Sequence, residues 1–256
     1  MTIAVIGGSG FYSFPHLENA QRQRIRSRYS LEPVSVLGGT LGGGRSKVYF
    51  IARHGDSHAV PPHKVNYRAN IDVLSQLGVE HIVAINAVGS VTFEMPPASI
   101  VLPDQIIDYS WGREHTYFDE FSGALSHIDF TRPLESPLRE KCFSRLVDTL
   151  PAWNGGVYGC TQGPRLETSA EIRKLKADGC DLVGMTLMPE AALAREKAIS
   201  YMSICVVTNW GAGLQYGKDV GDGTDVAPLN IEGIKDVLAA QLTKVQDVLV
   251  DTLILP

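Results

Sequence analysis

Two short segments of the chain carry polar side chains of complementary hydrogen-bonding character. Glu167 lies in Gly-Pro-Arg-Leu-Glu-Thr at 163–168, and Asn209 ends the largely apolar run Cys-Val-Val-Thr-Asn at 205–209. An ionised carboxylate only accepts hydrogen bonds, whereas a side-chain amide both donates and accepts them. Together the two side chains suit a planar ligand edge on which a donor lies beside an acceptor.

Three other segments have the residue types of an anion site. Gly7–Gly10 (Gly-Gly-Ser-Gly) follows the first apolar run, and the backbone amides of such a loop approach an anion closely, with the Ser9 hydroxyl as an added donor. Arg53 and His54 follow another apolar run, which predicts a place at the carboxyl edge of a sheet, where α/β proteins bind ligands. Thr186 precedes a predicted helix start, where unpaired amides attract anions.

Each of these segments also has an alternative interpretation. Gly7–Gly10 lacks the G-x-G-x-x-G spacing of a dinucleotide fold, and by itself it also suits a tight turn. Arg53-His54-Gly55 also opens the histidine phosphatases, in which the histidine is the phosphorylated nucleophile, but that motif normally follows the first strand. His54, His58 and His63 lack cysteine or carboxylate partners at metal-site spacing, so no metal site is predicted. Met185, a methionine beside a strand, is also typical of a core residue.

Short apolar runs that alternate with segments of helical periodicity are typical of an α/β domain with a buried sheet. Strands are predicted over 3–6, 48–52, 81–85, 99–102, 157–160, 181–183 and 201–207. Helices are predicted near 66–77, 136–149, 169–176, 190–198 and 231–249. Thr168 and Glu171 have capping-box spacing, which puts Glu167 just before a helix. Gly38–Gly44 is typical of a turn, and no linker divides the chain, so we predict one domain over 1–256.

Composition narrows the possible partners. The chain has 256 residues, 44% hydrophobic and 20% charged, with a net charge of −5, which leaves no electrostatic footprint for nucleic acid. No stretch approaches the roughly 18 apolar residues of a membrane span, and the N-terminus enters a predicted strand without a leader pattern. The four cysteines lack paired spacing. We expect a soluble, cytoplasmic protein with free thiols that binds small molecules.

Six blocks of the sequence, in order, carry a family resemblance. They lie at 7–10, 52–55, 64–70, 86–90, 163–168 and 184–190. Through them essentially the whole chain resembles the trimeric nucleoside phosphorylases, which include purine nucleoside phosphorylase and methylthioadenosine phosphorylase. The resemblance implies a single three-layer α/β domain with a central mixed sheet, and a homotrimer with active sites near subunit interfaces. It also implies a pentosyltransferase of purine salvage that uses inorganic phosphate as co-substrate and needs no cofactor.

Carried over residue by residue, the resemblance assigns roles to the segments above. Glu167 and Asn209 would face the purine, beside Leu166, and Met185 would contact the ribose. Arg53, Glu167 and Asn209 are the expected catalytic residues. The residues expected around phosphate are Ser9, Arg53, His54, Ala87 and Thr186.

The base-facing pair departs from the methylthioadenosine branch, which the chain otherwise resembles. That branch has a serine where Glu167 stands and an aspartate where Asn209 stands. A 6-oxopurine presents an N1 hydrogen for Glu167 to accept and an O6 for Asn209 to donate to, whereas adenine presents the reverse pattern. A site built around such groups discriminates by ~10⁴-fold or more. We therefore expect a 6-oxopurine nucleoside as substrate.

The 5′ end of the sugar is expected to meet an apolar wall. Purine nucleoside phosphorylases have a histidine in the C-terminal helix region, where this chain has Ile231 and Ile234, although both also suit a helix core. His127 matches a position that lies near this pocket from the neighbouring subunit. The combination resembles the bacterial S-methyl-5′-thioinosine phosphorylases. The alternatives are a general inosine and guanosine phosphorylase, a methylthioadenosine phosphorylase, a phosphohydrolase, and a nucleotide-binding module without chemistry.

Overall fold

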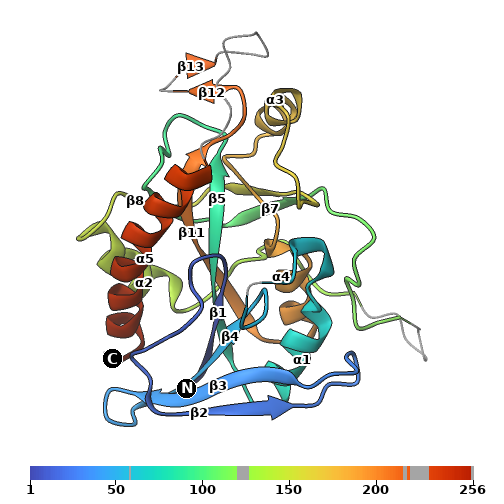
Figure 1. Ribbon diagram of the computed structural model, residues 1–256, viewed down its shortest axis with the longest axis vertical. Helices are drawn as coiled ribbons and strands as arrows, with labels where there is room; N and C mark the ends of the chain where they lie inside the picture. Colours follow the sequence, from blue (N-terminus) through green and yellow to red (C-terminus); the bar gives the residue numbers. More distant parts are fainter. Residues whose placement is uncertain (58, 120–126, 216–217, 220–230, 255–256) are drawn as a thin grey trace.

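A mixed β-sheet forms the middle layer of the molecule (Figure 1). The computed structural model describes residues 1–57, 59–119, 127–215, 218–219 and 231–254. Within them the large sheet has eleven strands: β1 (Thr2–Gly7), β2 (Glu18–Ile25), β3 (Val34–Leu41), β4 (Ser46–Ala52), β5 (His81–Ser90), β6 (Ile100–Leu102), β7 (Gln105–Asp108), β8 (Ala152–Asn154), β9 (Val157–Cys160), β10 (Leu182–Gly184) and β11 (Ser200–Trp210). The short pair β12 (Leu214–Gln215) and β13 (Lys218–Asp219) lies apart.

The long strands β5 and β11 form the centre of this sheet. β1 is parallel to both β4 and β5, and β11 is parallel to β5. The carboxyl ends of these four strands therefore meet at one edge. β10 is antiparallel to β5, with Val183 opposite Gly89, so the chain after β10 runs back toward Ala87 and Asn86. The predicted α/β domain with a central mixed sheet is confirmed.

Helices cover both faces of the sheet. They are α1 (Tyr67–Gln76), α2 (Arg139–Val147), α3 (Ser169–Ala177), α4 (Leu187–Glu196) and α5 (Ile231–Ile254), with a 3₁₀ turn at Pro62–Lys64. Figure 1 shows α2 and α5 on one side of β5 and β11, and α1 and α4 on the other. Alternate residues of β1 serve the two layers, since Ile3 and Val5 lie in the core with α5 while Ala4 and Ile6 lie in the core with α1.

The prediction of a turn over Gly38–Gly44 is wrong in its first half, because β3 continues to Leu41. Gly38 and Gly39 are strand residues at which the chain passes close to its neighbours. A Cβ on Gly38 would lie 2.9 Å from the Tyr49 ring, and one on Gly39 would lie 2.8 Å from the Glu18 carbonyl oxygen. Only glycine fits such close approaches within a strand.

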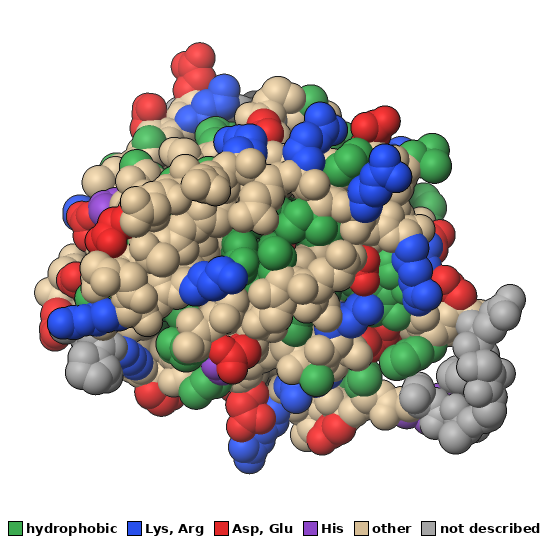
Figure 2. Space-filling model, turned by 90° about the horizontal axis from the view of Figure 1, so that it is seen from below, with side chains coloured by type: hydrophobic (Ala, Val, Ile, Leu, Met, Phe, Trp, Pro, Cys, Tyr) green, Lys and Arg blue, Asp and Glu red, His purple; other side chains and the backbone are tan. Residues whose placement is uncertain are grey.

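Two surface properties bear on possible partners. Among the described residues, no helix is both long and apolar enough to cross a membrane. Acidic and basic side chains are interspersed over the face shown in Figure 2. A mixed-sign surface of this kind differs from the clustered basic patch that a nucleic-acid backbone requires.

Candidate active site

A cavity of about 960 Å³ opens at the carboxyl edge of the sheet. Its walls come from the ends of β1, β4, β5 and β11, from the segment that follows β10, and from α5. The described lining includes ten of the residues named from the sequence: Ser9, Arg53, His54, Ala87, Leu166, Glu167, Met185, Thr186, Asn209 and Ile234. The fold thus brings together segments that are up to 225 positions apart in the chain (9 to 234).

The glycine loop after β1 lies directly against Arg53. A Cβ on Gly8 would lie 2.9 Å from Arg53 Nη1 and 2.5 Å from the Ile85 carbonyl oxygen. A side chain at this position would therefore push the loop away from the guanidinium. The absence of a side chain at Gly8 lets the loop, with Ser9, lie beside Arg53 at one end of the cavity.

Arg53 is buried and ion-paired, which the sequence did not suggest. Its Nε and Nη2 donate to the two carboxylate oxygens of Glu190 at 2.8 and 2.7 Å, and Nη1 donates to the Ile85 carbonyl at 3.0 Å. Both side chains of the pair are fully buried, and the Tyr201 hydroxyl donates to Glu190 at 2.8 Å. Burial alone lowers the pKa of Arg53, but the charge and hydrogen bonds of Glu190 outweigh it and raise this pKa.

This geometry limits what Arg53 offers to a ligand. Three of its five N–H groups are used by Glu190 and Ile85, so two N–H groups remain for an anion. Its positive charge is also balanced by the Glu190 carboxylate. An anion at this end of the cavity would therefore be held mainly by oriented hydrogen bonds rather than by excess charge.

Further donors surround the same end. His54 is buried, and its Nδ1 lies 2.8 Å from the Val60 carbonyl oxygen. Because a carbonyl only accepts, Nδ1 carries the hydrogen of this bond. Thr186 lies at the N-cap of α4, and Ala87 lies in β5. The five predicted phosphate residues thus come from four separate segments and line one cavity.

Asn86 belongs to this cavity but was not among the predicted site residues. Its side chain is 1% exposed, and among the described residues neither its Nδ2 nor its Oδ1 has a hydrogen-bond partner. Buried polar groups in proteins are almost always hydrogen-bonded. Asn86 therefore calls for a polar ligand group in the cavity, and its place inside the Asn-Ala-Val-Gly-Ser block was the only sequence signal.

Asn209 lines the same cavity. A β-bulge in β11 shifts its pairing with β5 between Val207 and Asn209, so that Asn209 lies opposite Gly89. Bulges re-aim side chains in this way next to functional sites. The Thr208 hydroxyl lies 2.8 Å from Asn209 Oδ1, and Asn209 Nδ2 donates to the Trp210 carbonyl at 2.7 Å. These two bonds fix the plane of the amide and leave one N–H of Nδ2.

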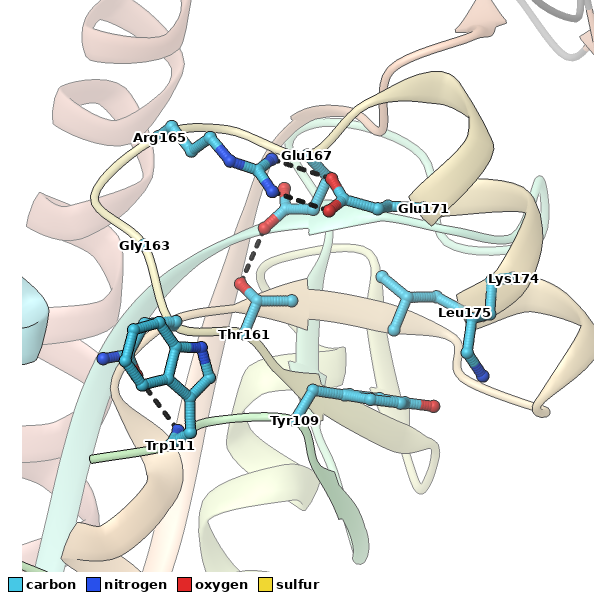
Figure 3. Close-up of a pocket in the computed structure, with 10 residues that line it drawn as sticks. Tyr109, Trp111, Thr161, Gly163, Arg165, Glu167, Glu171, Lys174 and Leu175 are labelled. Atoms are coloured by element: carbon cyan, nitrogen blue, oxygen red, sulfur yellow. Dashed lines mark hydrogen bonds and ion pairs between the residues drawn. The ribbon is translucent and has the colours of Figure 1, made fainter. Parts of the chain in front are cut away.

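Glu167 lies in the loop between β9 and α3 (Figure 3). It lines both the large cavity and a smaller one of about 340 Å³. The Thr161 hydroxyl donates to its Oε1 at 2.6 Å. The guanidinium of Arg165 donates its hydrogen bonds to Glu171, at 2.7 and 2.8 Å, although its charge also interacts with Glu167. The predicted capping box of Thr168 and Glu171 is confirmed, so α3 begins directly behind Glu167.

An apolar surface of α5 forms part of the cavity wall. Ile234, Leu238 and Ala239 of α5 line the cavity together with Lys235. The side chain of Ile231 lies outside the described residues. His127 is exposed and does not line the cavity of its own chain; its expected role in a neighbouring subunit stays a prediction. No cluster of three His, Cys, Asp or Glu side chains suited to a metal occurs in the described part of the chain.

Comparison with known proteins decides the family. The model of the family described as "Phosphorylase superfamily" matches residues 2–254. The chain belongs to this superfamily.

Relatives of this phosphorylase extend the comparison. A probable S-methyl-5′-thioinosine phosphorylase of Xylella fastidiosa is 47% identical over 225 residues, which cover 87% of this chain and 94% of the relative. A 6-oxopurine nucleoside phosphorylase of Pyrococcus furiosus is 44% identical, covering 84% of this chain and 82% of that protein. The structure of Schistosoma mansoni methylthioadenosine phosphorylase with adenine has a TM-score of 0.85 at 28% identity, covering 99% and 91% of the two chains.

Proposed function

We propose that this phosphorylase cleaves a 6-oxopurine nucleoside with inorganic phosphate. The preferred reaction is S-methyl-5′-thioinosine plus phosphate to hypoxanthine plus 5-methylthioribose 1-phosphate, as a step of purine and methylthio salvage in the cytoplasm. The observation that carries the proposal is one cavity that is lined by Glu167 and Asn209 as well as by Ser9, Arg53 and Thr186. The names of the relatives from Xylella and Pyrococcus support it.

At the anion end, phosphate would accept hydrogen bonds from the residues that surround Arg53. The two remaining N–H groups of Arg53, the Ser9 hydroxyl and the loop amides supply donors. The buried Nδ2 of Asn86, which has no partner among the described residues, would donate to a phosphate oxygen. Such fixed donors hold the nucleophile in line with C1′, which supplies a proximity effect without a cofactor.

The bond changes follow from this placement. A phosphate oxygen forms a bond to C1′ while the bond from C1′ to the purine breaks, and the electron pair of the broken bond leaves with the base. Positive charge builds on the ribosyl ring, beside the anion, and negative charge builds on the purine at N7 and O6. The remaining N–H of Asn209 Nδ2 would donate to one of these two atoms, and Glu167 would accept the N1 hydrogen. Fixed donors at a developing charge contribute a few kcal/mol each.

In this proposal the sugar lies between the phosphate and the purine. Met185 lines the cavity between Glu167 and Thr186 in the proposed order of base, ribose and phosphate. Ile234, Leu238 and Ala239 present an apolar surface that suits a 5′-methylthio group better than a hydroxyl. We further propose a homotrimer in which His127 of a neighbouring subunit closes this pocket.

The test is purine release from methylthioinosine, inosine and methylthioadenosine at equal concentration, each with and without phosphate. We expect phosphate-dependent hypoxanthine release that is fastest from methylthioinosine. A preference for inosine would favour the second candidate, a general 6-oxopurine nucleoside phosphorylase, which the Pyrococcus relative supports. A preference for methylthioadenosine would refute the roles of Glu167 and Asn209, and release without phosphate would indicate a hydrolase.

A further inference from the structure

We propose that Thr161 is a positioning residue for Glu167, and that Arg113 fixes Thr161 relative to the segment that carries Met185. The inference rests on the proposed function, because it assigns Glu167 to the purine. It starts from one short hydrogen bond, between the Thr161 hydroxyl and Glu167 Oε1 at 2.6 Å (Figure 3).

Glu167 needs such a partner because of where it lies. It is only half-buried, and it follows Pro164, Arg165 and Leu166, which are exposed. A glutamate in an exposed loop samples several rotamers, and ordering it on binding a ligand costs free energy. Among the described residues, the Thr161 hydroxyl donates a hydrogen bond to the Glu167 carboxylate. That bond selects one orientation of Glu167 before the purine arrives.

The chemistry of the partner matters as much as its position. A hydroxyl is neutral, so it orients one carboxylate oxygen and leaves the negative charge available to accept an N–H of the ligand. A cation in the same place would neutralise that charge. Arg165 is the nearest candidate in the sequence, and it binds Glu171 instead. The hydrogen bonds of this cation therefore go to Glu171, and a neutral threonine hydroxyl orients the Glu167 carboxylate.

Thr161 is itself held at both of its backbone groups. Its N–H donates to the Gly184 carbonyl at 2.8 Å, and its carbonyl accepts from Arg113 Nη2 at 3.1 Å. The hydroxyl also lies 3.3 Å from the Gly184 carbonyl oxygen. A side chain anchored in this way at the end of β9 can transmit a fixed position to Glu167.

Arg113 joins two segments of the cavity wall. It is 8% exposed, and besides Thr161 it donates to the Gln162 carbonyl at 2.8 Å and to Gln162 Oε1 at 3.0 Å. Its Nη1 donates to the carbonyls of Met185, at 2.9 Å, and Met188. One guanidinium thus ties the start of the Glu167 loop to the segment on which Met185 and Thr186 lie.

The experiment compares Thr161→Val with Thr161→Ser. Valine keeps the branched shape but removes the hydroxyl, so we expect kcat/KM for the oxopurine nucleoside to fall by about 10-fold, the size of one hydrogen bond to a charged group. The loss should lie mainly in KM for the nucleoside, with KM for phosphate within about twofold of wild type. Thr161→Ser should recover most of the loss, because it restores the donor.

Thr116→Val is the matched control. The Thr116 hydroxyl also donates to a carboxylate, Glu196 Oε1 at 2.7 Å, at a partly buried position that lines neither cavity. The Thr116→Val variant should lose about as much folding stability as Thr161→Val, and it should leave the KM values for nucleoside and phosphate unchanged. Arg113→Lys should instead impair the use of both nucleoside and phosphate, because it releases both segments. Unchanged phosphate use in a folded Arg113→Lys enzyme would overturn the role of Arg113.

A double-mutant cycle with Glu167→Gln separates positioning from other effects. If Thr161 acts through Glu167, Thr161→Val should cost much less in the Glu167→Gln background than in wild type. Equal losses in both backgrounds, or wild-type kinetics of Thr161→Val beside an impaired Glu167→Gln, would refute this inference alone. A wild-type enzyme that releases no hypoxanthine with phosphate would refute the proposed function, and the inference with it.

Discussion

The buried pair of Arg53 and Glu190 predicts an unusually large effect of a nearly isosteric substitution. Glu190→Gln keeps the shape of the side chain but removes the charge that faces the guanidinium. Both side chains are fully buried and two hydrogen bonds of 2.7 and 2.8 Å join them. Removing one partner of a buried pair costs about 3–5 kcal/mol, because the other charge stays in the interior without compensation.

The measurement is the free energy of unfolding by urea, together with the melting temperature at one fixed protein concentration. For a domain of this size, each kcal/mol lowers the melting temperature by about 2–4 °C, so Glu190→Gln should melt about 6–20 °C below wild type. Glu135→Ala is the control, since Glu135 pairs with Arg132 at 3.5 Å and both are mostly exposed. An exposed pair contributes about 0–1 kcal/mol.

A loss below about 1 kcal/mol for Glu190→Gln, equal to the control, would show that water reaches this pair. Glu190 would then not be needed to balance the charge of Arg53 at the proposed anion site. Tyr201→Phe gives an independent check, because it removes only the hydrogen bond at 2.8 Å to Glu190. It should cost about 1.5–3 kcal/mol, the contribution of one hydrogen bond to a charged group.

Three further predictions follow from the described side chains. Asn209→Asp should lower kcat/KM for oxopurine nucleosides by roughly 100-fold and admit aminopurine substrates; an unchanged substrate profile would exclude Asn209 from the base site. Burial raises the pKa of the Cys142, Cys160 and Cys205 thiols to about 12, and it also raises the pKa of the Cys180 thiol. A disulfide reagent at pH 8 should therefore label the native protein slowly and label all four thiols rapidly after unfolding. Hydrogen bonds from Arg165 and the Thr168 backbone lower the pKa of Glu171 to about 2. The contribution of the ionised Glu171 to folding stability should therefore be complete above pH 4.5, the ordinary pKa of a glutamate, and disappear as the pH falls toward 2. The difference in unfolding free energy between wild type and Glu171→Gln should shrink over that range.

The strands that were predicted from the sequence are those that are buried on both faces. β1, β5 and β11 are continuous apolar runs, because helices cover the sheet on each side. β2 has the sequence Glu-Asn-Ala-Gln-Arg-Gln-Arg-Ile and is exposed along nearly its whole length. It has neither an apolar run nor an alternating pattern, and only pairing with β3 makes it a strand. An edge strand of this kind leaves no signal in a single sequence.

Some residues of the candidate site were predicted from the sequence, and others were missed. Residues such as Ser9, Glu167 and Asn209 were found because their types at strand ends suggest ligand contact and because their blocks resemble a family. Glu190 was missed as the partner of Arg53, because 137 positions separate the two residues and only the packing of α4 against the sheet brings them together. Thr161 was missed because a threonine six residues before a glutamate indicates nothing until the loop geometry is known.

Arg53 and Glu167 are each held by a hydrogen-bonding partner. At the proposed phosphate site, Glu190 balances the charge of Arg53, so a bound anion would keep most of its own charge, which in the proposed reaction lies beside the ribosyl cation. At the proposed base site, a neutral hydroxyl donates to Glu167, so the carboxylate keeps its capacity to accept an N–H. Glu190 thus orients Arg53 while the bound anion keeps its charge, and the Thr161 hydroxyl orients Glu167 while the carboxylate keeps its charge. Low-dielectric surroundings strengthen the effect at Arg53, whose side chain is fully buried together with that of Glu190, since a charge acts over a longer range there than in water.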